Sequence, residues 1–227
     1  MATQLTWLGH GSWLIETGGH TLLLDPYLDD APTAPLKSAD VSPQFILVSH
    51  GHFDHVNDVA KIARRCDASV VAVWEICEWL NKQGIKKTID MNTGGGMDLP
   101  FGRVKLTMAQ HSSTLPDGSP AGNPVGFLLT LEGKTVYFAC DTALFLDMQL
   151  IGRVGLELAV LPIGDRYTMG PDDSIQAIDL LQPKRVAPAH YNTWPPIAQD
   201  AQAWARRVKS ETDAEPIVLE PGGKIVL

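Results

Sequence analysis

The sequence of 227 residues has few cysteines, no long apolar run and no excess of positive charge. Its three cysteines, Cys66, Cys77 and Cys140, are widely spaced and contain no CxxC pair, which argues against a disulfide framework. We therefore expect reduced thiols, buried as small apolar groups, in a cytoplasmic protein.

The charge balance and the hydrophobic pattern exclude two classes of partner. The net charge of −8 argues against a broad basic surface for nucleic acid and against a polybasic membrane anchor. No segment approaches the roughly 20 apolar residues of a membrane helix. The opening MATQLTWLGHGSWLIE also lacks the charged start and apolar run of a signal peptide. Because no repeat or long polar linker divides the chain, we expect a single domain over residues 1–227.

Strand-like and helix-like patterns alternate along the chain. Short apolar runs predict strands at 6–9, 12–17, 20–26, 45–50, 69–74, 103–110, 126–141, 156–164, 185–190 and 216–227. The segment 126–141 reads as a hairpin, since its pair Glu132-Gly133 suits a two-residue turn. Helices are predicted around 59–66, 75–84, 172–182 and 197–210, with N-caps at Asn57 and near Asp172. Strand blocks followed by helices predict two sheets packed face to face with helices outside.

The most informative stretch is FILVSHGHFDHVNDV, which places three of the seven histidines and an aspartate within six positions. These residues are His50, His52, Asp54 and His55, and their side chains are ligands for zinc and similar metals. If the chain stays extended after the strand, His50, His52 and Asp54 share a face and His55 turns elsewhere. That arrangement favours two neighbouring metal positions over one.

Three further residues of ligand type stand where predicted strands end. His111 closes RVKLTMAQ, Asp141 ends TVYFACD and His190 ends RVAPAH. Sites form at such positions because the chain leaves the sheet there. We therefore interpret these three residues as parts of the same metal site. His20, in the turn TGGHT, is interpreted as a solvated side chain.

In chain order, these seven residues resemble the signature of the metallo-β-lactamase-fold superfamily of hydrolases. That signature is HxHxDH, a separate His, a bridging Asp and a final His. The segments WLGHGSWLIE, TLLLDP, QHSS and PIGDRYTMGPDD resemble more narrowly a bacterial branch of metal-dependent hydrolases related to ascorbate-6-phosphate lactonase. The resemblance implies an α/β fold, a four-layer αββα sandwich of two mixed sheets with the site along one edge.

The resemblance also implies how the metals are held. His50, His52 and His111 would bind one divalent ion, and Asp54, His55 and His190 the other, with Asp141 as the bridge. True β-lactamases commonly carry cysteine at the position of Asp141. Cys140, one position earlier, would point to the opposite face of an extended strand, so we interpret it as a buried thiol.

The implied chemistry is hydrolysis. Two divalent ions about 3.5–4 Å apart lower the pKa of a shared water from near 16 toward 7. A donor set without thiolate fits Zn²⁺ and also Mn²⁺, Fe²⁺ or Ni²⁺. We expect a cytoplasmic hydrolase whose substrate is a small-molecule ester, lactone or sugar-phosphate lactone.

Further residues are candidates for catalysis or substrate binding. Asp54 is a candidate general base if only one metal position fills. His10, in LGHGS, is a candidate proton donor or substrate contact, or else forms a structural hydrogen bond. Arg166 is a candidate partner for an anionic substrate group, with a surface salt bridge as the alternative. Trp194 is either a packing residue or a wall of the pocket.

Other functions remain open at this point. A phosphodiesterase or nuclease of the same fold is one, although RNA-cleaving relatives generally carry an additional domain. An iron-based oxygen or nitric oxide reductase is another, although such relatives typically have Glu where His52 stands. A non-catalytic metal-binding protein is a third. Homo-oligomer formation is also open, whereas neither nucleic acid nor membrane is an expected partner.

Overall fold

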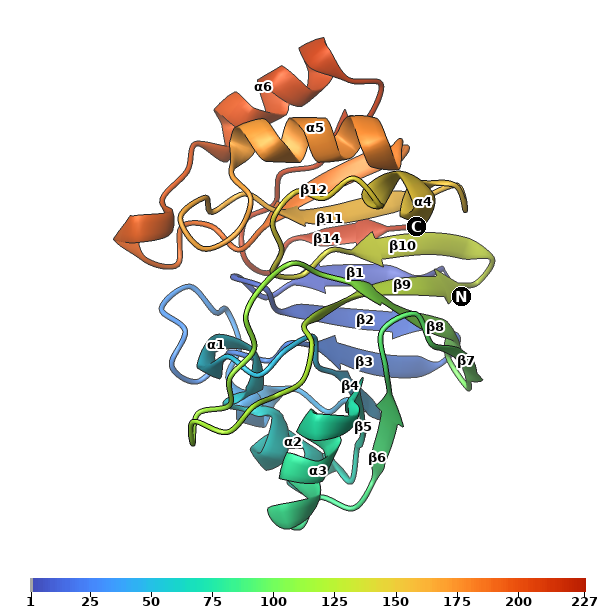
Figure 1. Cartoon of the computed structure of the whole chain (residues 1–227), viewed down its shortest axis with the longest axis vertical. Helices are drawn as coiled ribbons and strands as arrows, with labels where there is room; N and C mark the ends of the chain where they lie inside the picture. Colours follow the sequence, from blue (N-terminus) through green and yellow to red (C-terminus); the bar gives the residue numbers. More distant parts are fainter. Residues whose placement is uncertain (1) are drawn as a thin grey trace.

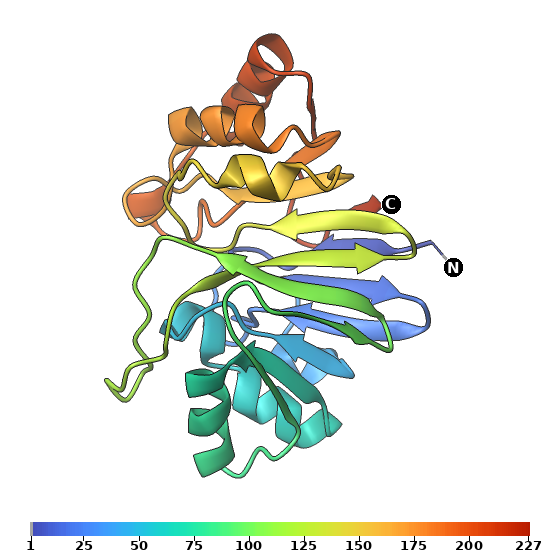
Figure 2. The ribbon, with the colours of Figure 1, turned by 45° about the vertical axis from the view of Figure 1, so that its right-hand side comes forward.

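Two seven-stranded mixed sheets face each other in the computed structural model, which describes residues 2–227. Helices cover the outer side of each sheet, which gives four layers (Figure 1). The predicted α/β class and αββα arrangement are confirmed. Both ends of the chain lie side by side at the paired strands β1 (Gln4–Trp7) and β14 (Lys224–Val226), as Figures 1 and 2 show.

The first sheet has the order β14-β1-β2-β3-β4-β5-β6. Its first four members pair antiparallel, and the strands from β3 to β6 run parallel. The remaining bounds are β2 (Trp13–Thr17), β3 (His20–Leu24), β4 (Phe45–Leu47), β5 (Ser69–Val73) and β6 (Thr88–Met91).

The second sheet has the order β13-β12-β11-β10-β9-β8-β7. Its strands are β7 (Gly96–Leu99), β8 (Gly102–Met108), β9 (Val125–Leu131), β10 (Lys134–Phe138), β11 (Leu158–Pro162), β12 (Arg185–Ala189) and β13 (Glu215–Pro216). Strands β10 to β13 are parallel to one another, and β9 lies antiparallel between β8 and β10. Consequently β8, β10, β11 and β12 all point the same way.

Three helices lie beside each sheet (Figure 1). Those beside the first are α1 (Phe53–Val56), α2 (Val59–Cys66) and α3 (Trp74–Lys82), and those beside the second are α4 (Met148–Gly152), α5 (Pro171–Leu181) and α6 (Ala201–Glu211). Two short 3₁₀ helices, η1 (Ser38–Asp40) and η2 (Pro195–Ile197), lie in loops. Among residues 2–227, no helix has the length and apolar character needed to cross a membrane.

The hydrophobic core lies between the sheets and beneath the helices. Every residue of β11 is buried, as expected for a parallel strand covered on both faces. Trp13, Phe127 and Phe138 are among the largest fully buried side chains. The hairpin of β9 and β10 turns at Glu132 and Gly133, which both have positive φ (49° and 78°), so the predicted two-residue turn is confirmed.

The histidine cluster is less extended than the sequence predicted. The chain is extended up to His52, but α1 begins at Phe53 and carries both Asp54 and His55. The prediction that Asp54 continues an extended face was therefore wrong. The predicted N-cap at Asn57 was also wrong, since this residue ends α1 and Asp58 precedes α2.

Two other helices start at different residues from those predicted. Helix α5 begins at Pro171 after Gly170, so Asp172 lies in its first turn and is not its N-cap. Proline suits a first helical position, where its missing N–H has no partner to lose. Helix α6 begins only after Asp200, whose carboxylate accepts the Ala203 N–H.

Candidate metal centre

The ends of four strands and one short helix bring the predicted ligands to one edge of the two sheets. His111 lies in the loop after β8, Asp141 follows β10 and His190 follows β12, and these strands point the same way. His50 and His52 follow β4 of the other sheet. Figure 1 shows the long loop between β8 and β9 running toward α1. All seven predicted ligands meet there.

The seven side chains form two groups that share one carboxylate. In the first group His52 Nδ1 lies 2.9 Å from His50 Nε2 and 3.3 Å from His111 Nε2. The second group consists of Asp54, His55 and His190. His10, which is not one of the seven, lies with them, and the donor atoms of these four residues are within 4.8 Å of one another.

Asp141 lies between the two groups. Its Oδ2 is close to four imidazoles: 3.1 Å from His190 Nε2, 3.5 Å from His55 Nε2, 3.5 Å from His111 Nε2 and 3.8 Å from His50 Nε2. A single carboxylate oxygen in contact with both groups has the position required of a bridging ligand.

A hydrogen-bonded carboxylate behind the centre orients two of the imidazoles. Asp25 accepts hydrogen bonds from His55 Nδ1 (2.9 Å), Ser49 N (2.7 Å) and Ser49 Oγ (2.6 Å). Ser49 Oγ in turn accepts from His50 Nδ1 at 2.9 Å. Both histidines thereby use Nδ1 for these bonds and turn Nε2 toward Asp141.

His10 is fully buried and contacts the second group through Asp54. Its Nε2 donates to Asp54 Oδ2 at 3.0 Å, and its Nδ1 accepts from the Thr193 hydroxyl at 2.7 Å. Burial, followed by the neighbouring charge of His190, lowers the pKa of His10 to about 3. A neutral imidazole with this pair of partners holds the carboxylate of Asp54 in place.

Burial and charge separate the imidazoles into two kinds. Burial lowers the pKa of His50, His52 and His111, which are therefore neutral at pH 7. Burial also lowers the pKa of His55 and His190, but the neighbouring carboxylates, Asp141 foremost, together outweigh it. The pKa of His55 is raised well above its usual value, and that of His190 is raised to about 9.

The two carboxylates of the centre are ionised. Burial raises the pKa of Asp54 and Asp141, but the charges of the neighbouring histidines and the hydrogen bonds from them outweigh it, and both values are held well below the usual range. The largest such contribution comes from His55 for Asp54 and from His190 for Asp141. Paired negative and positive charges therefore face each other inside the centre.

This donor set fits divalent cations. Three buried imidazole nitrogens, His55 Nε2 and both nitrogens of His190, form no well-directed hydrogen bond among the described residues, although both Nε2 atoms lie within 3.5 Å of Asp141 Oδ2. Burying a polar nitrogen without a partner is costly unless something binds it. A metal ion would replace the protons on His55 and His190, so that the positive charge facing the carboxylates is kept.

The centre opens onto a cavity of about 610 Å³. Asp54, Asp141 and three of the histidines line it, together with Ser112, Arg166 and the aromatic residues Phe53, Tyr167 and Trp194. Phe53 and Tyr167 are 49% and 52% exposed, although both are large apolar side chains. Arg166 also lies over the Tyr167 ring, 5.4 Å from its centroid.

Cys140 does not belong to the clusters of possible metal ligands, although not for the predicted reason. Strand β10 ends at Phe138, and Cys140 has a positive φ of 54°, so the backbone is not extended there. The thiol contacts the Phe138 carbonyl oxygen. Burial raises its pKa well above the usual value, which keeps the thiol protonated.

Sequence reasoning missed several residues of the site. Asp25, Ser49 and Thr193 were not assigned a role, nor was Phe53 assigned to the cavity wall. Asp25 follows β3, so the strand-end argument that identified Asp141 would have found it. Thr193 carries no such signal, because its position depends on how the loop after β12 folds back.

Comparison with known proteins places these features in a family. The family described as a beta-lactamase superfamily domain matches residues 4–190. A relative named as a UPF0173 metal-dependent hydrolase, from Desulforamulus reducens, is 45% identical over 224 residues, covering 96% of this chain and 97% of the relative.

Two solved structures share the fold. Igni18, a metallo hydrolase from the archaeon Ignicoccus hospitalis, is 34% identical, with a TM-score of 0.91 and coverage of 100% of this chain and 99% of that one. The metallo-beta-lactamase fold protein YhfI of Bacillus subtilis is 11% identical with a TM-score of 0.78, and each chain covers the whole of the other. At that identity, the second likeness shows the fold alone.

Proposed function

The chain belongs to the β-lactamase superfamily, and on that premise we propose that it is a metal-dependent hydrolase of a small-molecule ester or lactone, sugar-phosphate lactones included. The observation that carries this proposal is the convergence of seven ligand-type side chains at one centre, five of which line a cavity of about 610 Å³. A cavity of this size suits a small molecule.

We assign two divalent cations to the centre, with zinc as the first candidate. His50, His52 and His111 would hold one, and Asp54, His55 and His190 the other, with Asp141 shared between them. When bound, such cations polarise the oxygen of the scissile group and make water more acidic. Because both sheets supply ligands, we treat residues 1–227 as one hydrolase domain.

The contacts of Asp54 favour a ligand role over that of a general base. Its low pKa, caused by His55 and by the hydrogen bond from His10, makes it a weak base at neutral pH. His10 lies behind Asp54 and does not line the cavity. We therefore assign His10 to positioning Asp54, which is the structural alternative that its sequence context left open.

The cavity walls support a substrate with an apolar part and one anionic group. Phe53, Tyr167 and Trp194 offer aromatic surface, and Arg166 is the one Lys or Arg side chain among the residues that line the cavity. A guanidinium pairs well with a carboxylate or a phosphate. A phosphodiester polymer would need a row of cations, so we do not favour a nuclease.

Metal analysis tests the proposal. The purified protein, reconstituted with Zn²⁺ and dialysed, is expected to retain between one and two equivalents, whereas less than about half an equivalent would contradict the assignment. Hydrolysis is then screened with aryl esters and lactones that carry one carboxylate or phosphate. His52→Ala and Asp54→Ala are each expected to abolish turnover of any substrate found.

A matched histidine variant supplies the control. His20 lies on β3, next to the ring of Phe45 and outside the centre. His20→Ala should retain both metal and activity. Activity that survives in both His52→Ala and Asp54→Ala would overturn the mechanism.

A further inference from the structure

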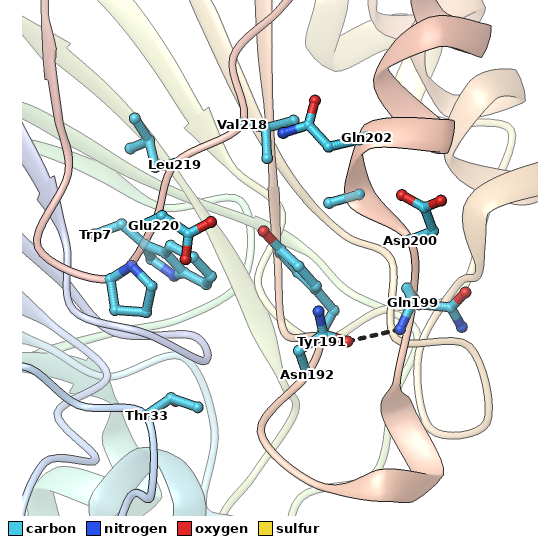
Figure 3. Close-up of a pocket in the computed structure, with 12 residues that line it drawn as sticks. Trp7, Thr33, Tyr191, Asn192, Gln199, Asp200, Gln202, Val218, Leu219 and Glu220 are labelled. Carbon is cyan, nitrogen blue, oxygen red and sulfur yellow. Dashed lines mark hydrogen bonds between the residues drawn. The ribbon is translucent and has the colours of Figure 1, made fainter.

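A second cavity, of about 450 Å³, lies outside the metal centre (Figure 3). It is formed where the end of β1, the segment after β12, the start of α6 and the loop before β14 meet. We call it the C-terminal cavity. Its walls include Trp7, Val218 and Leu219, and its volume is within the range of small-molecule sites.

Two hydroxyl groups among the residues that line this cavity, those of Thr33 and Tyr191, have no hydrogen-bond partner in the described residues. Tyr191 is only 5% exposed, and its ring stacks on that of Trp7 with centroids 5.3 Å apart. Figure 3 shows its hydroxyl pointing into the cavity. No described residue forms a hydrogen bond with this hydroxyl, and because the atom is not fully enclosed by the protein, it is accessible to a ligand in the cavity.

The charge of the cavity is negative. Glu220 and Asp200 line it, and no Lys, Arg or His belongs to its walls in the part of the chain that the structure describes. Asp200 already caps α6 by accepting the Ala203 N–H. The carboxylate of Glu220 makes no ion pair within residues 2–227.

We propose that the C-terminal cavity binds a small organic cation, a primary amine or a guanidinium, through the Glu220 carboxylate and the Tyr191 hydroxyl. The carboxylate supplies charge and the hydroxyl accepts an N–H, while Val218 and Leu219 contact the apolar part of the ligand. An anion would meet two carboxylates there, and a purely apolar ligand would leave Tyr191 without a partner.

The C-terminal cavity is separate from the metal centre, but the backbone segment after β12 contributes residues to both. Tyr191 directly follows His190, and the carbonyl oxygen of His10 accepts both the Trp7 indole N–H (3.0 Å) and the His190 N–H (3.0 Å). A bound cation would therefore lie one residue from a proposed metal ligand without entering the centre.

Calorimetric titration of the metal-loaded full chain tests the proposal, with putrescine and agmatine as probes and 1,4-butanediol as the neutral analogue of putrescine. Both cations are expected to bind with millimolar or tighter affinity, and the diol at least about tenfold more weakly. Added salt should weaken cation binding, since the Glu220 carboxylate is exposed.

Substitutions inside and outside the C-terminal cavity test whether the cation binds there. Glu220→Gln should weaken cation binding about tenfold, and Tyr191→Phe about threefold. Glu215→Gln, which changes an exposed glutamate outside the cavity, should bind as the wild type does. Equal affinity of the wild type and Glu220→Gln would overturn the proposal. So would equal binding of the diol and the diamine, or no binding of either cation at about 10 mM.

Discussion

At the scale of single residues, Asp25 connects two of the proposed metal ligands. Its carboxylate accepts a hydrogen bond from His55 Nδ1. It also accepts one from the Ser49 hydroxyl, which in turn accepts a hydrogen bond from His50 Nδ1. One side chain therefore fixes the orientation of two imidazoles. Groups of this kind keep the second imidazole nitrogen free for a metal. His52 is held differently, since its Nε2 lies 3.3 Å from the Ser112 hydroxyl and its Nδ1 faces the centre.

We expect Asp25→Asn to weaken metal binding by about 10- to 100-fold while the protein stays folded. Oδ1 of Asp25 accepts the Ser49 N–H, and Oδ2 accepts both the Ser49 hydroxyl and His55 Nδ1. The NH₂ group of an amide would face the donors of one of these two sets, so those hydrogen bonds would be lost. Affinity is measured by competition with a chromogenic chelator, and folding by circular dichroism.

Asp58 provides a matched control for this substitution. It is also a buried aspartate, and it accepts the backbone N–H groups of Leu28 and Asp29 away from the metal centre. Asp58→Asn should lower stability and leave metal affinity within about threefold of the wild type. If the two variants lose metal affinity equally, the orienting role of Asp25 is wrong.

At the scale of elements, the sequence predicted all the strands that precede the site residues and missed two edge strands. Buried parallel strands such as β11 are continuous apolar runs, which a sequence reveals directly. Strands β6 and β7 were not predicted, because each is a short edge strand without a buried face. Helix α4 was missed for a similar reason, since five residues carry too little periodicity.

The ends of β11 and β12 meet closely, and this contact fixes the segment that carries His190. A Cβ at Gly164 would lie 2.3 Å from the carbonyl oxygen of His190, closer than two such atoms can approach. We expect Gly164→Ala to lower the free energy of unfolding by about 1–3 kcal/mol and to weaken metal binding. Denaturant titration and chelator competition measure the two effects.

Gly84→Ala is the control, because it also adds a methyl group to a glycine but causes no steric clash. Gly84 has a positive φ of 86° and nothing within 4 Å of its Cβ position. Gly84→Ala should cost about 1 kcal/mol of stability through backbone strain alone, with metal affinity unchanged. A Gly164→Ala protein with wild-type metal affinity would show that the His190 segment is not fixed by this contact.

At the scale of the whole molecule, the site depends on both sheets at once. His50 and His52 come from the edge of one sheet, and His111, Asp141 and His190 from the edge of the other. The order of the ligands along the chain could be predicted from strand ends and from the family resemblance. The cavity walls could be predicted only in part. Arg166 and Trp194, both candidates from the sequence, do line the cavity, whereas Phe53 was missed because its place at a helix start depends on tertiary packing.

A centre that joins two sheets should also stabilise the fold when it holds metal. At a free metal concentration of about 100 times Kd, binding adds about 2.7 kcal/mol to the free energy of unfolding. In a chain of this length that corresponds to a rise in Tm of about 5–10 °C. Calorimetry of the chelator-dialysed protein, before and after Zn²⁺ is added back, measures the rise.

The double variant His52→Ala/Asp54→Ala, which lacks a ligand in each group, should melt at nearly the same temperature in both conditions. If the wild type also melts at one temperature with and without Zn²⁺, the cluster does not act as a metal-dependent link between the sheets.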